Sequence, residues 1–144
     1  MKKQLFLCFS FFFSAAIYQA QILEVNPAFP TVNDVVTITY DATQGNAALV
    51  GQNQVYCHAG LITSASTSPT NWQFVQGNWG TVDAQVAMTN IGNNKHTITI
   101  DIDQFYGFPA TTTVLQLAFV FRNASGNIVG RAADGSDIYY TIYP

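Results

Sequence analysis

The sequence has little charge. Only 9% of its 144 residues are charged, with five lysines and arginines against eight aspartates and glutamates. Nucleic-acid binding needs a stripe of basic side chains that neutralises phosphates, and no such stripe occurs here. The same scarcity gives no electrostatic attraction to anionic lipids. We therefore predict no nucleic-acid partner, and neutral ligands remain.

The first 20 residues have the pattern of a secretory signal peptide. Lys2 and Lys3 precede an apolar run over residues 5–17, which is too short to cross a bilayer comfortably, and either residues 14–16 (SAA) or Ala20 offer small residues for cleavage. We interpret residues 1–20 as the signal peptide and residues 21–144 as one domain. The domain is then secreted or lies at the cell surface, outside the membrane after cleavage. An uncleaved N-terminal anchor is the alternative.

Catalytic apparatus is also missing. Cleavage would leave Cys57 as the single cysteine, which excludes an intrachain disulfide, and a lone thiol is usually a small buried hydrophobe. His58 and His96 lack zinc spacing, and no GxSxG pattern occurs. Asp101 and Asp103 are expected as neighbours on one strand, whereas the two carboxylates of a glycosidase face each other across the sugar. We predict no enzyme activity, no metal and no other cofactor.

Alternation of apolar and polar residues runs through most of the remaining chain. It is clearest in residues 35–41, 97–102, 115–122 and 138–143. A period of two in segments rich in β-branched and aromatic residues predicts half-buried strands. Turn signals with glycine and asparagine separate them. We predict an all-β fold, an antiparallel immunoglobulin-like β-sandwich, after the signal peptide.

Three local expectations accompany this fold. Leu115 should face the core together with Leu117, because the two residues lie two positions apart along the strand. The stretch around Pro27 and Pro30 is expected to be an edge strand interrupted by its prolines. Residues 134–137 (DGSD) should form a turn, a simpler account of their two aspartates than a calcium site.

Aromatic residues are concentrated in one part of the chain, Val55–Gly80. If Cys57 and its neighbours at alternate positions face the core, Tyr56 and His58 face outward together as an exposed pair. Trp72 and Trp79 follow this strand, and each either fills the sandwich core or lies on the surface. Exposed aromatic faces on a rigid sheet suit stacking against sugar rings.

Two blocks of sequence carry a resemblance to a known group of proteins: VYCHAGLITSASTSPTNWQFVQGNWG (residues 55–80) and LAFVFRNASGNIVGRAADGSDIYYTIY (residues 117–143). Together they resemble the starch-binding β-sandwich modules of secreted bacterial α-amylases, carbohydrate-binding module families 25 and 26. They are most similar to the N-terminal modules of amylase-like proteins from Bacteroidetes, and the resemblance covers residues 32–143. In the related modules the terminal block contains a tryptophan, followed by aspartate and paired asparagines, where residues 131–137 here read RAADGSD.

The resemblance implies a non-catalytic module that recognises α-glucan, either starch or maltooligosaccharide. Its ligand-binding positions would be Tyr56, His58, Trp72 and Trp79, with amides such as Asn78 bonding to hydroxyls. The implied partners are the polysaccharide and a separate glycoside hydrolase, which the module would serve as an α-amylase accessory. The alternative is a structural or protein-interaction sandwich of the cell envelope without a sugar site. Two buried tryptophans favour that alternative, whereas a shared exposed face favours sugar.

Overall fold

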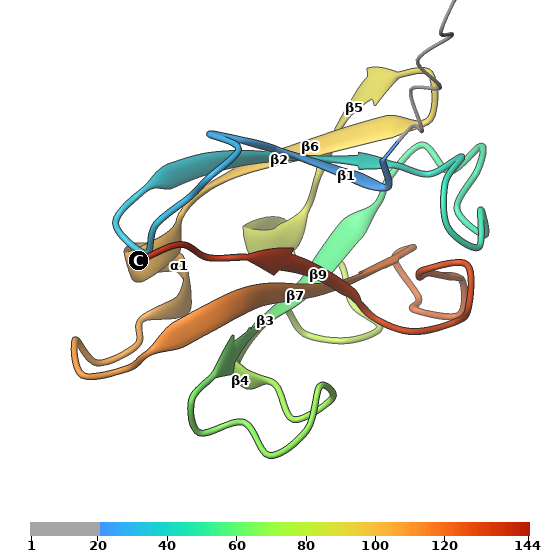
Figure 1. The fold of residues 1–144 in the computed structure, drawn as a ribbon. Coiled ribbons are helices and arrows are strands. Elements are labelled where there is room, and N and C mark those ends of the chain that lie inside the picture. The colour runs from blue at the N-terminus through green and yellow to red at the C-terminus, as the bar shows by residue number, and fades with distance from the viewer. Residues whose placement is uncertain (1–20) are drawn as a thin grey trace, which may run out of the picture.

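Residues 21–144 are described by a computed structural model, and the predicted signal peptide lies outside them. The described chain folds into two antiparallel β-sheets packed face to face (Figure 1). In chain order the elements are β1 (Leu23–Asn26), β2 (Val35–Asp41), β3 (Tyr56–Thr63), β4 (Gln73–Gln76), the 3-10 turn η1 (Ala84–Val86), β5 (Thr89–Gly92), β6 (Lys95–Asp101), α1 (Ile102–Tyr106), β7 (Val114–Arg122), β8 (Val129–Gly130) and β9 (Ile138–Thr141). The predicted all-β sandwich is confirmed.

The first sheet has the strand order β1-β2-β6-β5. The second has the order β4-β3-β7-β8, and β9 also pairs with β7. The strands β3 and β7 lie at the centre of the second sheet and pair along nearly their whole length. None of the described residues forms a helix long and apolar enough to cross a membrane.

The core lies between the sheets and follows the predicted alternation. Ile38 and Tyr40 of β2 are fully buried, as are Phe119 and Phe121 of β7. The rings of Tyr40 and Phe121 stack across the sandwich with centroids 3.9 Å apart and planes at 11°. Burying each such side chain stabilises the fold by about 1.5–3 kcal/mol, so this aromatic contact helps to hold the two sheets together.

The expectation for Leu115 is wrong, because β7 contains a bulge at that residue. Thr63 pairs with Val114 and Ile62 pairs with Gln116, which leaves Leu115 as an extra residue. A bulge reverses the side of the strand on which the following side chains lie. Leu115 is consequently 45% exposed, whereas Val114 is buried.

Two other local expectations also fail. The edge strand β1 ends at Asn26, so the segment containing Pro27 and Pro30 follows the strand instead of forming it. Asp101 ends β6 and caps α1, where its carboxylate accepts a hydrogen bond from the Gln104 amide at 3.1 Å, and Asp103 lies in the first turn of this helix. The two aspartates therefore do not share a strand face, because N-capping ends the strand between them.

His96 is a polar residue inside the core. It lies opposite Tyr40 in the pairing of β2 with β6, is 0% exposed, and finds no hydrogen-bond partner for either ring nitrogen among the described residues. Burial disfavours the charged imidazolium and lowers the pKa of His96. The folded protein consequently requires this histidine to be neutral.

This requirement predicts a loss of stability in mild acid. The unfolded chain protonates a histidine near pH 6.5, whereas the folded state resists protonation of His96. The free energy of unfolding should be at its full value above about pH 6.5 and fall below it, by at most about 1.4 kcal/mol per pH unit for each such histidine. Urea unfolding between pH 7.5 and 5 should show a shallower decrease for His96→Leu than for the wild type. Equal slopes in the two proteins would contradict the account.

Candidate functional site

The outer face of the second sheet carries the aromatic residues singled out in the sequence. Three cross-strand pairs of β3 and β7 lie on this face: Tyr56 with Arg122, His58 with Val120, and Gly60 with Ala118. Cys57 and Ala59 are buried on the opposite face, toward the core. Tyr56 and His58 therefore share the outer face, as their alternation with Cys57 and Ala59 predicts.

Tyr56 is not exposed, however, so half of the expected exposed pair is wrong. It is only 4% exposed, and the guanidinium carbon of Arg122 lies 4.9 Å from the centroid of its ring. The loops that follow β4 and β7 are joined above it through this arginine. Tyr56 supports the site from below, whereas His58 is half-buried and remains beside the tryptophans.

Arg122 is the central residue that the sequence reasoning missed. It is 0% exposed and donates hydrogen bonds to four backbone carbonyls. Its Nη1 reaches the carbonyls of Thr81, Asn123 and Ala124 at 3.0–3.1 Å, and its Nη2 reaches that of Asn78 at 2.7 Å. Four carbonyl dipoles and two aromatic rings therefore surround this buried charge. A sequence signal was present, since Arg122 is the single charged residue of β7.

Trp79 lies on the loop between β4 and η1 and is 45% exposed. The Arg122 guanidinium carbon is 5.7 Å from its ring centroid, and His58 meets it edge to face at 5.2 Å. The indole also rests against Gly126, where an added Cβ would lie 2.6 Å from Nε1. Of the two positions that the sequence leaves open for Trp79, core or surface, the structure has the second: Trp79 packs on the outer face and not in the core.

Trp72 lies directly before β4, on the other side of His58. A β-bulge sets its place, because Ala59 pairs with Gln76 but Leu61 pairs with Gln73, so that two residues of β4 oppose Gly60 alone. Phe74 within the bulge has φ of 51°, which is rare for a bulky residue. The Trp72 side chain then packs over Gly60, and an added Cβ there would be 3.0 Å from its Cβ and Cε3. Trp72 is half-buried and also lies outside the core.

The two indoles form a corner and not a flat platform. The ring of His58 stands between them, with centroids 6.1 Å from Trp72 and 5.2 Å from Trp79. Its plane makes angles of 32° with Trp72 and 87° with Trp79, so the indole planes are inclined by at least 55°, the difference between these angles. Such a corner can contact a curved surface from two sides.

The polar groups of the site are largely engaged in holding its loops. Burial lowers the pKa of His58, the positive charge of Arg122 lowers it further, and a bond to the Gly77 carbonyl opposes both, so the imidazole is neutral at pH 7. Asn78 binds Asp83 through its backbone amide at 2.8 Å and through its side-chain amide at 3.2 Å. These two bonds, with a third from Gln85, lower the pKa of Asp83. The side-chain oxygen of Asn78 remains available to a ligand.

The block at residues 131–137 lies next to β9 and forms a turn. Asp134 accepts hydrogen bonds from the amide and hydroxyl of Ser136, as expected for a turn, and Asp137 forms an ion pair with Arg131. Among residues 21–144, no group of three histidine, cysteine, aspartate or glutamate side chains has the arrangement of a metal site. Nearby, the Tyr139 hydroxyl donates to the Pro69 carbonyl at 2.8 Å and so ties β9 to the loop before Trp72. The sequence reasoning did not single out Tyr139.

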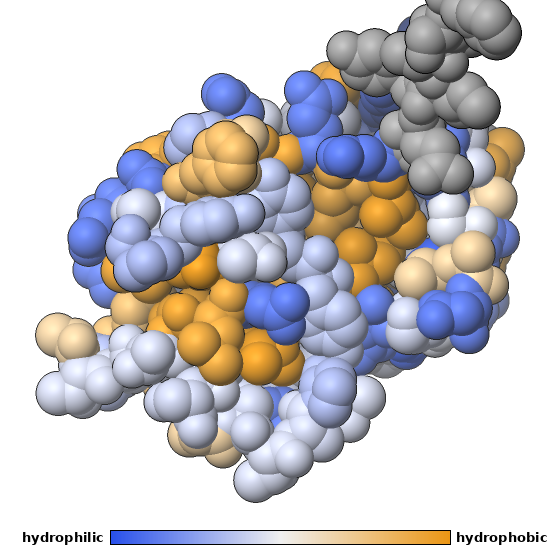
Figure 2. Space-filling model, viewed as in Figure 1, coloured by the Kyte–Doolittle hydropathy of each residue, from blue (hydrophilic) through white to orange (hydrophobic). Residues whose placement is uncertain are grey.

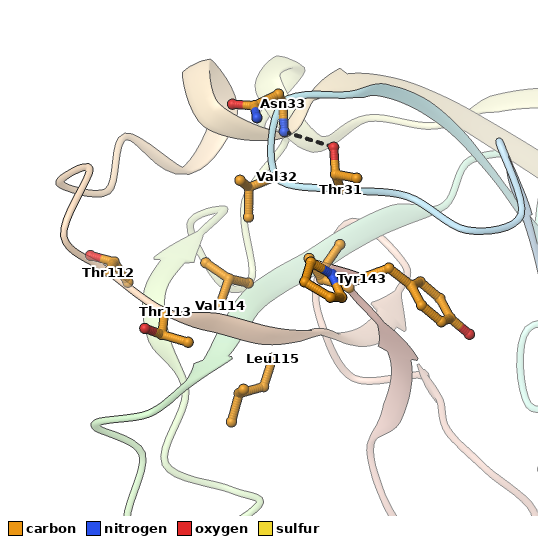
Figure 3. A pocket seen from close by; sticks show the side chains of 10 residues that line it. Thr31, Val32, Asn33, Thr112, Thr113, Val114, Leu115 and Tyr143 are labelled. Carbon is orange, nitrogen blue, oxygen red and sulfur yellow. Dashed lines mark hydrogen bonds between the residues drawn. The ribbon is translucent and has the colours of Figure 1, made fainter.

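A separate pocket of about 570 Å³ lies at the opposite end of β7 from Arg122. Its walls come from the segment before β2, the start of β7 and the end of the chain, and its lining includes Val32, Val114, Leu115 and Tyr143 (Figure 3). Figure 2 shows apolar side chains gathered over the first half of β7 on this face. None of the predicted ligand-binding residues lines it.

Comparison with known families gives one match. A family described as a domain of unknown function (DUF8578) matches residues 23–129. This range contains all of the predicted ligand-binding positions and Arg122. No curated protein matches the sequence.

The close contact between Gly60 and Trp72 leads to a test of the site's geometry. Gly60→Ala should displace the indole and cost about 1–3 kcal/mol of stability, because the new methyl group would meet Trp72 at 3.0 Å. In a Trp79→Phe background, where Trp72 is the only tryptophan, the emission spectrum should change. Gly51→Ala is the control, since a Cβ there meets no atom within 4 Å, although its backbone has φ of 81°. Unchanged emission in Gly60→Ala would show that Trp72 does not rest on Gly60.

Proposed function

The chain belongs to this family of unknown function, and from the geometry of its own site we propose that it is a non-catalytic module that binds α-glucan. The observation that carries the proposal is the pair of inclined tryptophans on the outer face of the second sheet, with His58 between them. Both residues are held by packing against glycines of the rigid sheet and its loops. The ligand would be starch or a maltooligosaccharide.

Ligand shape supports an α-linked chain. An α-1,4-glucan curves along its length, whereas a β-1,4-glucan extends as a flat ribbon. Indole planes inclined by at least 55° suit successive sugar rings of a curved glucan. A flat glucan would instead need two coplanar indoles. Each stacking contact should contribute on the order of 1 kcal/mol, so the site would bind weakly.

The polar surroundings also suit an uncharged ligand. Exposed Asn71 and Asn78 directly precede Trp72 and Trp79 in the chain, and the side-chain nitrogen of Asn71 and the side-chain oxygen of Asn78 can bond to hydroxyl groups. Arg122, the cation at the centre of the site, is buried and has its Nη atoms bonded to carbonyls. A sugar without charge would therefore meet aromatic faces and amides. The protein would work outside the cell or at its surface, as an accessory to a separate glycoside hydrolase.

A second function, a protein-interaction or structural sandwich, has one observation in its favour. Ala118 and Val120 lie on the outer face of the second sheet yet are buried, so the side chains and loops above them shield the sheet. Half-buried Trp72 belongs to this cover and would have a structural use without any ligand. Trp79, at 45% exposure, is the residue that separates the two functions.

Binding measurements test the proposal. The domain over residues 21–144 should bind maltoheptaose by calorimetry and be retarded by soluble starch in native gels, with no binding to cellohexaose. Trp79→Ala should weaken binding by about fivefold, because it removes one stacking contact of about 1 kcal/mol. Phe29→Ala is the matched control, since Phe29 is 73% exposed and packs edge to face on Tyr143, away from the site.

Three results would contradict the proposal. If the folded wild type binds neither maltoheptaose nor soluble starch, α-glucan is rejected as the ligand and the interaction sandwich becomes the better account. Equal binding of maltoheptaose and cellohexaose would show that curvature does not select the ligand. Retention of full affinity by Trp79→Ala would move the site elsewhere on the domain.

A further inference from the structure

We infer that Arg122 is a positioning residue of the ligand site, which sets the place and exposure of Trp79; this inference rests on the proposed function. Its guanidinium group lies between two aromatic rings, 4.9 Å from the centroid of Tyr56 and 5.7 Å from that of Trp79. Both distances are within the range of a cation–π contact. The guanidinium group therefore contacts the rings of both Tyr56 and Trp79.

The same guanidinium joins two loops that the sheet itself does not connect. It bonds to Asn78 and Thr81 on the loop that carries Trp79, and to Asn123 and Ala124 on the turn after β7. That turn contains Gly126, against which the indole of Trp79 rests. Arg122 therefore holds the indole from below and also holds the loop segments that border it.

Only arginine has the donor geometry for this role. Its planar guanidinium presents five N–H donors in a fixed fork, so several carbonyls can be bonded while the cation stays close to the aromatic rings. A lysine ammonium could keep the charge but has three donors at one point and no flat face. No carboxylate lies within ion-pair distance of this charge, since the ion pairs found within residues 21–144 are Lys95–Asp41 and Arg131–Asp137.

The position of Arg122 separates this role from core stability. Its neighbour Phe121 faces the core, whereas Arg122 points to the outer face and lies at the end of β7. The pairing of β3 with β7 continues for seven further residue pairs without it. Arg122→Lys should therefore leave the sandwich folded while it releases Trp79.

Fluorescence tests the inference without any ligand. In a Trp72→Phe background, the emission reports Trp79 alone. Arg122→Lys and Arg122→Met should both increase quenching of this emission by acrylamide, because the indole loses its support and becomes more accessible. Lys95→Met is the control for loss of a positive charge, since Lys95 lies on the other sheet with its nitrogen 4.0 Å from Asp41. Quenching should be unchanged in that variant.

Binding measured in two backgrounds separates a positioning role from a purely structural one. With maltoheptaose, Arg122→Lys should raise Kd by about fivefold, close to the effect expected for Trp79→Ala. In a Trp79→Ala background the same substitution should have almost no further effect, because Arg122 acts through Trp79. A residue that only stabilised the whole domain would weaken binding in both backgrounds by the same factor.

The outcomes distinguish this inference from the proposed function. Suppose that neither the wild type nor the variants bind maltoheptaose, but quenching of Trp79 increases in Arg122→Lys. This result would reject α-glucan as the ligand and retain the positioning role of Arg122. Normal binding by the wild type with unchanged quenching and unchanged Kd in Arg122→Lys would overturn the positioning role. If Arg122→Met fails to fold, Arg122→Lys and Tyr56→Leu, which removes the ring beneath the guanidinium, decide the question by the same two measurements.

Discussion

The register of β3 on β7 is the constraint on which both the core and the candidate site depend. This pairing directs Cys57 and Phe121 into the core and places Tyr56 opposite Arg122 on the outer face. A shift by one residue would exchange the two faces, bury the arginine in an apolar core and expose its phenylalanine neighbour. Such a shift would cost the burial of a charge without partners, so the register is strongly specified.

The buried charge on the outer face, that of Arg122, is not stabilised by an ion pair. Backbone carbonyls and aromatic rings surround Arg122, which avoids the need to desolvate a second charged group beside it. In a protein with so few charged residues, this arrangement links two loops through one buried cation. Under the proposed function, the exposed aromatic rings of the site and the scarcity of charge in the chain favour the same class of ligand, an uncharged one.

Much of the fold could be predicted because alternation is a local property. Residues 35–41 and most of residues 115–122 form strands with the expected faces, and the turn at Asp134 has the expected hydrogen bonds. The incorrect predictions arise from local backbone features that the alternation of apolar and polar residues does not reveal. A bulge turned Leu115 outward, and the capping of a short helix by Asp101 ended a strand early. In the candidate site, the shared face of Tyr56 and His58 followed from alternation, but the cover over Tyr56 did not.

By itself, the sequence determined the all-β architecture, the absence of a basic surface and the faces of β3, because these depend on composition and on a period of two. Only the tertiary structure decided that Tyr56 is covered, that both tryptophans lie outside the core, and that their planes are inclined. Each of these depends on contacts between segments far apart in the chain: Arg122 with residues 78–81, Trp79 with Gly126, and Trp72 with Gly60. Such contacts leave no periodic pattern, since they arise only when loops from different strands meet on one face of the sheet.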